Sequence, residues 1–287
     1  MSIETTTDAT SISVSANTIE AWRYVFRSPR PHIHPLTTPA GVVLTRDAPD
    51  DHPWHHALWF TIKFVNGENF WEEYGPRGIL RHDEPPSVRV EGDTVRLEGT
   101  VRWVGVDRET VVINETREIV GQGRTLDLRS VLVPTTDVVL DRTPFTTWGG
   151  YGGLTFRGRP DLVDSRLLLA DGSVHDRVHG VDSEWLDLSG TVEGAPVGVA
   201  MFADPAGRFG RVPWYGSTRA DTYGNEGWSN FFNAAFLWHG PLEITAGEPL
   251  EICHRVIAHD GIWSHDEAAA AYSDYRSGRG GSNPEQR

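Results

Sequence analysis

Residues 88–103 read Val88-Arg-Val90, Glu91-Gly-Asp-Thr94 and Val95-Arg-Leu-Glu-Gly-Thr-Val-Arg-Trp103, and this stretch decides the fold class. In its last segment the apolar residues fall at positions 95, 97, 101 and 103, with charged or small polar residues between them. A period of two is typical of a strand with one buried face, and the Gly-Asp turn predicts a hairpin with residues 88–90. We therefore expect Trp103 to lie in the core of a β protein.

Strands of the same kind recur along the chain. Similar runs, such as Thr110–Val120, Thr125–Val133 and Leu250–Ala258, are separated by Gly-, Asp- and Pro-rich turns roughly every 8 to 15 residues. One helix is predicted, from Ser264 to about Arg276, because Ser264 and the Glu three residues later have capping-box spacing. Many strands with a single terminal helix predict an all-β, antiparallel sandwich.

Both ends of the chain contain little that could be buried. Residues 1–17 are rich in Ser and Thr, and residues 277–287 are rich in Gly, Ser and charged side chains, so both are expected to be disordered tails. Residues 18–276 show no internal repeat and no Pro/Ser-rich linker. We therefore expect a single β-sandwich domain over residues 18–276.

The composition excludes several classes of protein. There are 26 Lys and Arg against 40 Asp and Glu, a net charge of −14, whereas binding to nucleic acid or to an anionic membrane needs basic patches. The single cysteine, Cys253, excludes internal disulfides and Cys-rich metal sites. No apolar run reaches the roughly 18 residues that cross a bilayer, and the N-terminus does not resemble a signal peptide. We expect a cytoplasmic protein, and the sequence leaves open whether it forms a homo-oligomer.

The chemically reactive residues concentrate in the N-terminal third, where five of the twelve histidines fall within 25 residues. Imidazole titrates near neutrality and binds metals, so histidines beside carboxylates suit proton transfer or metal binding. Glu72 follows two aromatic residues, which raise the pKa of a carboxyl and suit a general base, although adjacent Glu73 leaves the register ambiguous. The candidate catalytic residues are His52, His55, His34 and Glu72, and a divalent metal ion could bind at His52, His55 and Glu72.

The same region resembles a known family. Residues 31–73 read PHIHPLTTPAGVVLTRDAPDDHPWHHALWFTIKFVNGENFWEE, which contains the combination RD…DHPxH…LWF…VNGxxFW. This combination is similar to the start of a bacterial β-sandwich family of unknown function that often carries the automated label "methane oxygenase PmoA". The resemblance continues through residues 148–153 to AGEPLEICHRVIAHDG, and it covers roughly residues 20–262. The residues that match the family pattern are His34, Arg46, Asp47, His52, His55, Asn66 and Trp71.

The oxygenase label does not fit this chain, because a particulate methane oxygenase subunit must span the membrane and no segment here could do so. The resemblance implies instead a large double-sheet sandwich similar to galactose-mutarotase-like carbohydrate proteins, and it favours sugars as substrates. Sugars present apolar C–H faces that stack on aromatic rings, and hydroxyls that need polar partners. The candidate substrate-binding residues are Arg46, Asp47, Trp54, Trp59, Trp71, Tyr151, Trp228 and His254.

These observations favour an enzyme of sugar or glycoside catabolism. A histidine would act as general acid, and a carboxylate or a second histidine as base, in an epimerisation, an elimination or a hydrolysis, with metal assistance as an open variant. One alternative is a non-catalytic carbohydrate-binding sandwich, and another is a small-molecule oxygenase with iron on two His and one carboxylate. No dinucleotide or phosphate-binding motif is present, so no nucleotide cofactor is expected.

Overall fold

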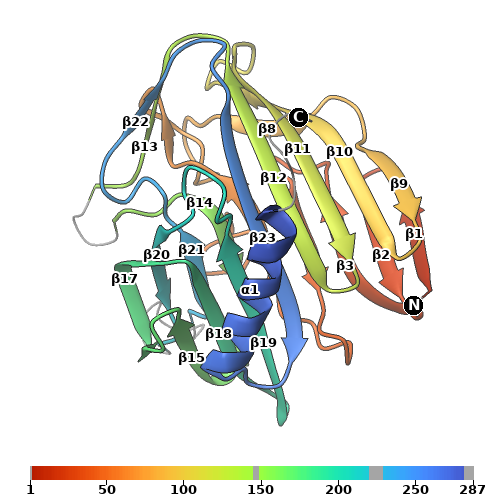
Figure 1. Ribbon diagram of the computed structural model, residues 1–287. Coiled ribbons are helices and arrows are strands. Elements are labelled where there is room, and N and C mark those ends of the chain that lie inside the picture. The colour runs from red at the N-terminus through yellow and green to blue at the C-terminus, as the bar shows by residue number, and fades with distance from the viewer. Residues whose placement is uncertain (1, 145–148, 220–228, 281–287) are drawn as a thin grey trace.

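The computed structural model describes residues 2–144, 149–219 and 229–280, and β-strands are its predominant regular structure. The strands form two large sheets and one small sheet, and every pairing among the described strands is antiparallel. The described residues contain one helix, which packs on the outside of a large sheet (Figure 1). The predicted antiparallel β-sandwich with one C-terminal helix is therefore confirmed.

One large sheet has nine strands, and its centre carries the candidate site. In order across the sheet these strands are β1 (Ile3–Thr7), β2 (Ser11–Ala16), β3 (Ile19–Val25), β4 (His32–Leu36), β5 (Leu58–Thr61), β14 (Gly153–Arg157), β21 (Phe231–Ala234), β20 (Val212–Ser217) and β17 (Arg177–Ser183). At the centre β14 pairs with β5 on one side and with β21 on the other. Three segments that are far apart in the sequence are thus brought side by side.

The other large sheet has ten strands and includes the hairpin that the sequence predicts. In order across the sheet these are β16 (Val174–His175), β15 (Val163–Leu169), β18 (Trp185–Val192), β19 (Ala195–Ala203), β23 (Leu250–Asp260), β12 (Thr125–Pro134), β11 (Val111–Gln122), β10 (Thr94–Val104) and β8 (Ile79–His82), with β9 (Ser87–Glu91) also paired to β10. Thr94 lies opposite Glu91 in the β9–β10 hairpin, and Trp103 is fully buried. Both predictions for residues 88–103 are confirmed. The small sheet consists of β22 (Leu242–Ile244), β13 (Val138–Asp141), β6 (Phe64–Val65) and β7 (Glu68–Asn69).

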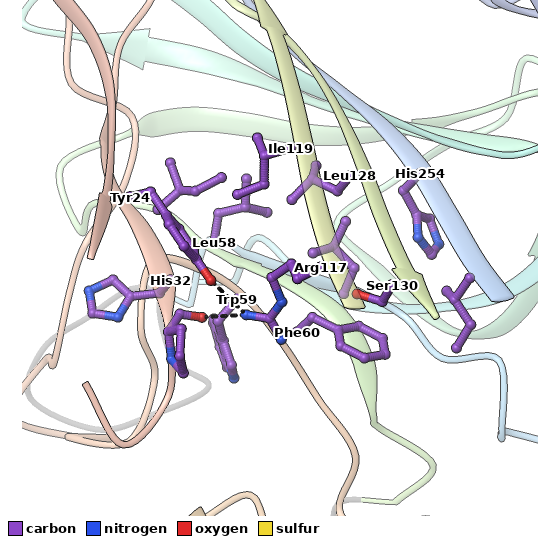
Figure 2. Close-up of a pocket in the computed structure, with 14 residues that line it drawn as sticks. Tyr24, His32, Leu58, Trp59, Phe60, Arg117, Ile119, Leu128, Ser130 and His254 are labelled. Carbon is purple, nitrogen blue, oxygen red and sulfur yellow. Dashed lines mark hydrogen bonds between the residues drawn. The ribbon is translucent and has the colours of Figure 1, made fainter. Parts of the chain in front are cut away.

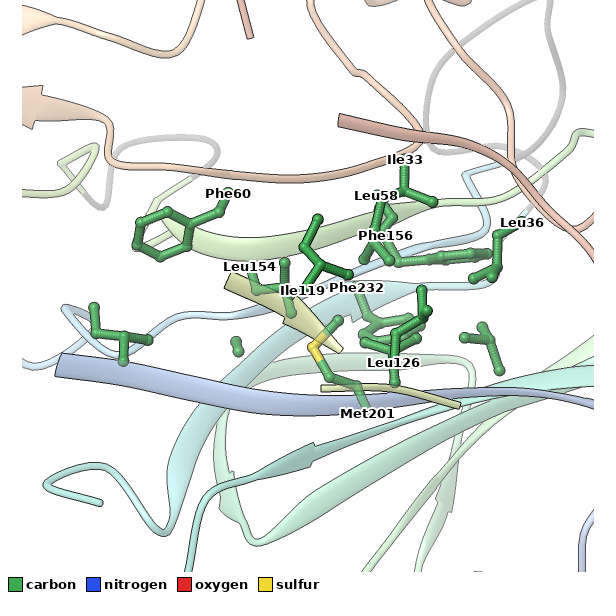
Figure 3. Close-up of a cluster of buried hydrophobic side chains, with 14 of the residues drawn as sticks. Ile33, Leu36, Leu58, Phe60, Ile119, Leu126, Leu154, Phe156, Met201 and Phe232 are labelled. Carbon is green, nitrogen blue, oxygen red and sulfur yellow. The ribbon is translucent and has the colours of Figure 1, made fainter. Parts of the chain in front are cut away.

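The hydrophobic core fills the space between the two large sheets. Figure 3 shows side chains of the nine-stranded sheet, among them Phe60, Leu154, Phe156 and Phe232, facing Ile119, Leu126 and Met201 of the other sheet. Side chains alternate along a strand, so the neighbours of these core residues point to the outer face of the nine-stranded sheet. This outer face presents Thr155, Phe231 and Asn233, which are buried by loops and not by the core.

The N-terminal segment is ordered where the sequence predicts a tail. Residues 3–7 and 11–16 form β1 and β2, which extend the nine-stranded sheet beyond β3. The prediction of disorder is wrong for them because Ile12, Val14 and Ala16 alternate with serines and are almost completely buried. A short alternating run can thus pair with an existing sheet edge even though its composition is polar.

The C-terminal helix α1 (His265–Gly280) has the predicted capping box. The backbone N–H of Ser264 donates to Glu267 Oε2 at 2.7 Å, and the Glu267 N–H donates to Ser264 Oγ at 3.3 Å. The helix runs four residues past the predicted end at Arg276, so residues 277–280 are helical and not a tail. The rest of the predicted tail, residues 281–287, lies outside the described residues.

Candidate active site

A cavity of about 200 Å³ lies on the outer face of the nine-stranded sheet. Its floor comes from β14, β20 and β21, and its walls come from the segment before β5, the segment after β7 and the residues just before β14. The lining residues are His52, Trp54, His55, Trp71, Glu72, Tyr151, Thr155, Tyr215, Phe231 and Asn233. The first six of these are candidate site residues from the sequence, and the structure brings them together.

The histidine loop, residues 47–56, delivers three of these side chains. Its ends are joined by a β-bridge between Asp47 and His56 and by a hydrogen bond from the Ala48 N–H to the His55 carbonyl oxygen at 2.9 Å. A turn closed by the His55 N–H and the His52 carbonyl oxygen, 2.8 Å apart, brings the two rings into a stack with centroids 4.5 Å apart. The two histidines therefore converge because the loop turns back on itself.

The imidazole of His52 is positioned by a carboxylate. Asp51 Oδ2 lies 3.0 Å from His52 Nδ1, and the Arg157 guanidinium donates to both oxygens of Asp51 at 2.9 and 3.1 Å. Burial raises the pKa of Asp51, but the contacts with His52 and Arg157 outweigh it, so the pKa is lowered and the group stays ionised. A carboxylate at Nδ1 fixes the ring orientation and directs proton exchange to Nε2.

His55 differs from His52 in its surroundings. Burial, followed by the charges of His52 and Arg157, lowers the pKa of His55 well below its usual value. Its Nδ1 is buried and has no hydrogen-bond partner in the part of the chain that the structure describes. His55 is therefore a neutral imidazole at the cavity wall, and it can exchange hydrogen bonds with a polar ligand.

Glu72 is held in a buried ion pair. Lys63 Nζ contacts Glu72 Oε2, and the Tyr151 hydroxyl donates to Glu72 Oε1 at 3.3 Å. The Lys63 and Glu72 side chains are each only 9% exposed. Burial lowers the pKa of Lys63, whereas burial and then the negative charge of Glu72 raise the pKa of Tyr151. The ambiguity between the two adjacent glutamates is thereby resolved: Glu72 lines the cavity and Glu73 contacts His56.

Aromatic rings line most of the cavity. Trp71 lies 4.9 Å from Tyr151, Tyr151 stacks on Tyr215 at 6.1 Å, and Tyr215 lies 5.3 Å from Phe231, all measured between ring centroids. Trp54 packs edge-on against His52 at 5.1 Å. The wall is thus a continuous apolar surface interrupted by a few polar groups, which is the usual make-up of a small-molecule site.

Asn233 and its neighbours on β14 fix the floor. The Asn233 side chain accepts from the Gly152 N–H at 3.0 Å and donates to the Leu154 carbonyl oxygen at 3.3 Å, which holds the segment that carries Tyr151. Gly153 has φ +110°, and a Cβ there would lie 2.4 Å from the Ala234 carbonyl oxygen, so only glycine fits this close approach. The Gly-rich sequence before β14 is thus explained by the path of the chain beneath the cavity.

Five residues of this site were not among the candidate site residues selected from the sequence. Lys63 is an ordinary lysine in a strand-like run, and no pattern in the sequence indicates its pairing with Glu72. For Asn233, the one available signal in the sequence was a polar amide side chain within the otherwise apolar run 231–237. The residues missed are Lys63, Thr155, Tyr215, Phe231 and Asn233.

A second polar cluster, which consists of His32, Asp47, His56 and Glu73, lies where the two ends of the histidine loop meet. His56 donates from Nδ1 to Asp47 Oδ1 at 2.8 Å and from Nε2 to Glu73 Oε1 at 3.0 Å. Burial lowers the pKa of His56, but its hydrogen bonds with Asp47 and Glu73 outweigh this and raise the pKa to about 9. His32 Nε2 lies 3.6 Å from Asp47 Oδ1, and the rings of His32 and His56 are stacked with centroids 4.9 Å apart.

The expected metal ligands are not the ones that the structure groups together. Within the described ranges, one set of three His, Asp, Glu or Cys side chains has its ligand atoms within 4.8 Å of one another, namely His32, Asp47 and His56. His52, His55 and Glu72, the set expected from the sequence, do not form such a group. His52 and His55 stack on each other at the cavity, whereas His56 contacts Asp47 in the second cluster, so histidine spacing alone does not show which residues converge with a carboxylate.

Several other candidate residues lie outside the cavity lining. His34 Nδ1 pairs with Thr45 Oγ1 at 2.9 Å, and Asp47 belongs to the second cluster. The Arg46 backbone N–H donates to the Arg157 carbonyl oxygen at 3.0 Å, and Trp59 packs behind the wall with its ring 5.4 Å from Trp71.

His254 and Trp228 complete the candidates. His254 lies on β23 beside a void of about 20 Å³ that also borders Arg117 (Figure 2). A void of this size holds about one water molecule, so it does not suit a substrate. Burial lowers the pKa of His254 to about 4, as for a neutral core histidine. Trp228 lies outside the described residues.

None of the curated proteins matches the chain. Among the described residues, no helix has both the length and the hydrophobicity of a transmembrane span. Among solved structures, the chain is similar to a galactose 1-epimerase from Lactobacillus acidophilus NCFM, with 9% identity, 91% of this chain and 100% of that chain covered, and a TM-score of 0.48.

Two further solved structures are similar to the chain. A galactose mutarotase related enzyme from Lactobacillus acidophilus shows 8% identity over 92% of this chain and 99% of that one, with a TM-score of 0.36. A polysaccharide lyase shows 12% identity over 95% of this chain and 34% of that one, with a TM-score of 0.40.

One family model matches the chain, and it does so over residues 11–273. Its description is a family of unknown function, which agrees with the resemblance seen in the sequence, and nothing in the match carries the methane oxygenase name. The matched range includes every strand except β1, the whole cavity lining and the first half of α1. The chain belongs to this family of unknown function, DUF6807.

Proposed function

We propose that the protein is a carbohydrate-active enzyme that transfers protons to and from a single sugar or oxidised-sugar unit bound in the cavity. The observation that carries this proposal is that His52, positioned by Asp51, and Glu72, positioned by Lys63, line the same aromatic cavity. An acid–base pair beside a platform for an apolar ligand face is the arrangement that proton-transfer chemistry on a sugar requires.

The lining suits a sugar ring. The C–H faces of a sugar stack on aromatic rings, and Trp54, Trp71 and Tyr151 offer such surfaces. The hydroxyls need directional partners, which Asn233 and the neutral imidazole of His55 supply. The volume of about 200 Å³ suits one ring and its substituents, so the occupant is a monosaccharide-sized molecule and not the interior of a polymer.

The two candidate catalytic groups have complementary roles. Lys63 contacts the Glu72 carboxyl group and supplies a compensating positive charge, so we assign Glu72 as the group that accepts a proton. Asp51 lies at Nδ1 of His52, so Nε2 is the nitrogen that would exchange a proton with the substrate, and we assign His52 as the acid. Tyr151, in contact with Glu72, would orient the carboxylate towards the substrate.

The choice of groups favours epimerisation or elimination over hydrolysis of a glycosidic bond. Most glycoside hydrolases place two carboxylates on either side of the scissile bond. Among the described residues that line this cavity, Glu72 is the one carboxylate. A single base with an imidazole acid suits removal of a C–H proton next to a carbonyl, as in an oxidised sugar.

The experiment incubates the protein with a panel of aldoses, ketoses, uronic acids and keto-sugars, and follows each by proton NMR for new anomer, epimer or vinyl signals. We expect one chemical class to turn over, with rates at least 100-fold lower in His52→Ala and in Glu72→Gln. His239→Gln and Glu248→Gln, at exposed positions, serve as matched controls and should retain the wild-type rate.

Two outcomes would contradict the proposal. Turnover that survives both His52→Ala and Glu72→Gln would remove these residues from the chemistry. Sugars that bind, as shown by saturation-transfer NMR, but never react would leave the non-catalytic carbohydrate-binding protein as the correct function.

A further inference from the structure

We propose that His32, Asp47 and His56 bind a divalent first-row transition-metal ion of the Zn²⁺ type, and that this ion joins the two ends of the histidine loop to β4. None of the three residues lines the cavity, so this site is separate from the proposed acid–base site. The ion would be structural: it would hold the loop that positions His52 and His55.

The three ligand atoms converge at spacings near those of a metal site. Asp47 Oδ1 lies 2.8 Å from His56 Nδ1 and 3.6 Å from His32 Nε2, and all three atoms lie within 4.8 Å of one another. Ligands about 2.1 Å from a common ion at tetrahedral angles are about 3.4 Å apart, so small side-chain shifts suffice. Two imidazoles and one carboxylate favour Zn²⁺, Co²⁺ or Fe²⁺ over Mg²⁺ and Ca²⁺.

The non-coordinating nitrogen of each histidine already has an acceptor. His32 Nδ1 lies 2.8 Å from the Arg30 carbonyl oxygen, and His56 Nε2 lies 3.0 Å from Glu73 Oε1. Metal-bound histidines are commonly oriented in this way by a carbonyl or a carboxylate on the other ring nitrogen. These contacts direct His32 Nε2 and His56 Nδ1 towards Asp47, although an ion must replace the proton now shared by Asp47 and His56.

The position of the site in the chain explains what the ion would do. Asp47 and His56 are bridge partners at the two ends of the histidine loop, whereas His32 belongs to β4. Three bonds to one ion would therefore fix both loop ends to the sheet. The Asp47 side chain is 31% exposed, so the ion has a path to solvent and room for a water ligand.

The test uses the full chain after treatment with a chelator, titrated separately with Co²⁺ and Zn²⁺. Binding of Co²⁺ is read from its visible absorption, and stoichiometry is read by equilibrium dialysis with elemental analysis. We expect one equivalent in the wild type, loss of binding in Asp47→Asn and His56→Gln, and affinity lowered about 10- to 100-fold in Glu73→Gln. His52→Ala serves as a matched histidine control and should still bind one equivalent.

The proposal is overturned if the wild type binds neither ion, if Asp47→Asn binds like the wild type, or if binding is lost in His52→Ala instead. Circular dichroism checks that each variant folds. A second measurement needs no variant: Zn²⁺ should shift the imidazole ¹⁵N resonances of His32 and His56 in the wild type and leave those of His52 and His55 in place. Unshifted His32 and His56 resonances would equally reject the site.

Discussion

Replacing Lys63 by methionine should strongly destabilise the protein, because it removes the positive partner of a buried carboxylate. Lys63 and Glu72 contact each other with only 9% of each side chain exposed, and the pair is flanked by Tyr151. Removing one member of a buried pair leaves an uncompensated charge and typically costs about 3–5 kcal/mol. Methionine replaces the four-carbon stem of lysine by an unbranched chain of similar length and lacks only the ammonium group, so loss of packing contributes little to this value.

The assay is urea unfolding followed by circular dichroism and tryptophan fluorescence, from which the free energy of unfolding is obtained. The double variant Lys63→Met/Glu72→Leu removes both charges at similar volume, so it should be more stable than Lys63→Met. Arg211→Met is the matched control, because Arg211 is 59% exposed and pairs with Glu184 at 3.1 Å. Its loss should stay below about 1 kcal/mol.

A loss in Lys63→Met no larger than that in Arg211→Met would refute this reasoning. Lys63 would then not hold Glu72 as a buried carboxylate, and the assignment of Glu72 as the base would lose its structural support. A double variant less stable than Lys63→Met would likewise show that packing, and not charge, dominates at this position.

Three further predictions test other parts of the account. Trp54→Ala should weaken binding of a sugar identified in the NMR panel by about 2- to 10-fold in calorimetry, with unfolding unchanged, and an unaltered affinity would remove Trp54 from the binding surface. Burial lowers the pKa of both His82 and His254 to about 4, below the unfolded value of 6.5, so the unfolded chain binds more protons between these values. The free energy of unfolding should therefore fall as pH drops from 6.5 to 4, by up to about 3 kcal/mol for each histidine. In urea unfolding of His254→Leu, this decrease should be smaller than in the wild type by the contribution of one histidine. Deletion of residues 1–16 should lower the thermal midpoint by several degrees or prevent folding, because it removes β1 and β2 and exposes the edge of β3, whereas an unchanged midpoint would mean that these strands are dispensable.

Local patterns in the sequence were sufficient to predict the fold class and part of the site. The alternation of residues 95–103 predicted a buried strand correctly, because a period of two is set by the backbone itself. The sequence named His52, His55 and Trp54 as candidate site residues, but their convergence on one cavity became visible only in the structure. Glu72 was likewise a candidate from its position after two aromatic residues, and the structure places it in the same cavity.

Long-range pairing placed the residues that were missed. Tyr215, Phe231 and Asn233 reach the cavity because β21 pairs with both β14 and β20, and no local pattern encodes that neighbourhood. The choice between Glu72 and Glu73 depends on the Asn69 side chain, whose Oδ1 accepts the backbone N–H groups of Trp71 and Glu72 at 2.9 and 3.3 Å.

The residues that converge as a possible ligand set were not predicted from the sequence, for a related reason. His55 and His56 are adjacent in sequence, yet one lines the cavity and the other contacts Asp47. The β-bridge between Asp47 and His56 decides which histidine points to which side, and this bridge depends on how the loop closes. Spacing between histidines therefore predicted that a cluster exists but not which residues form it.

The most direct test of the central claim is incorporation of solvent deuterium into the sugar that turns over. In D₂O the wild type should place deuterium at one carbon of that sugar, because the proposed base, Glu72, would remove a C–H proton and exchange it with solvent. Glu72→Gln should incorporate at least 100-fold more slowly, while Glu248→Gln should match the wild type. Turnover by the wild type without any deuterium at carbon, or unchanged incorporation in Glu72→Gln, would contradict the account.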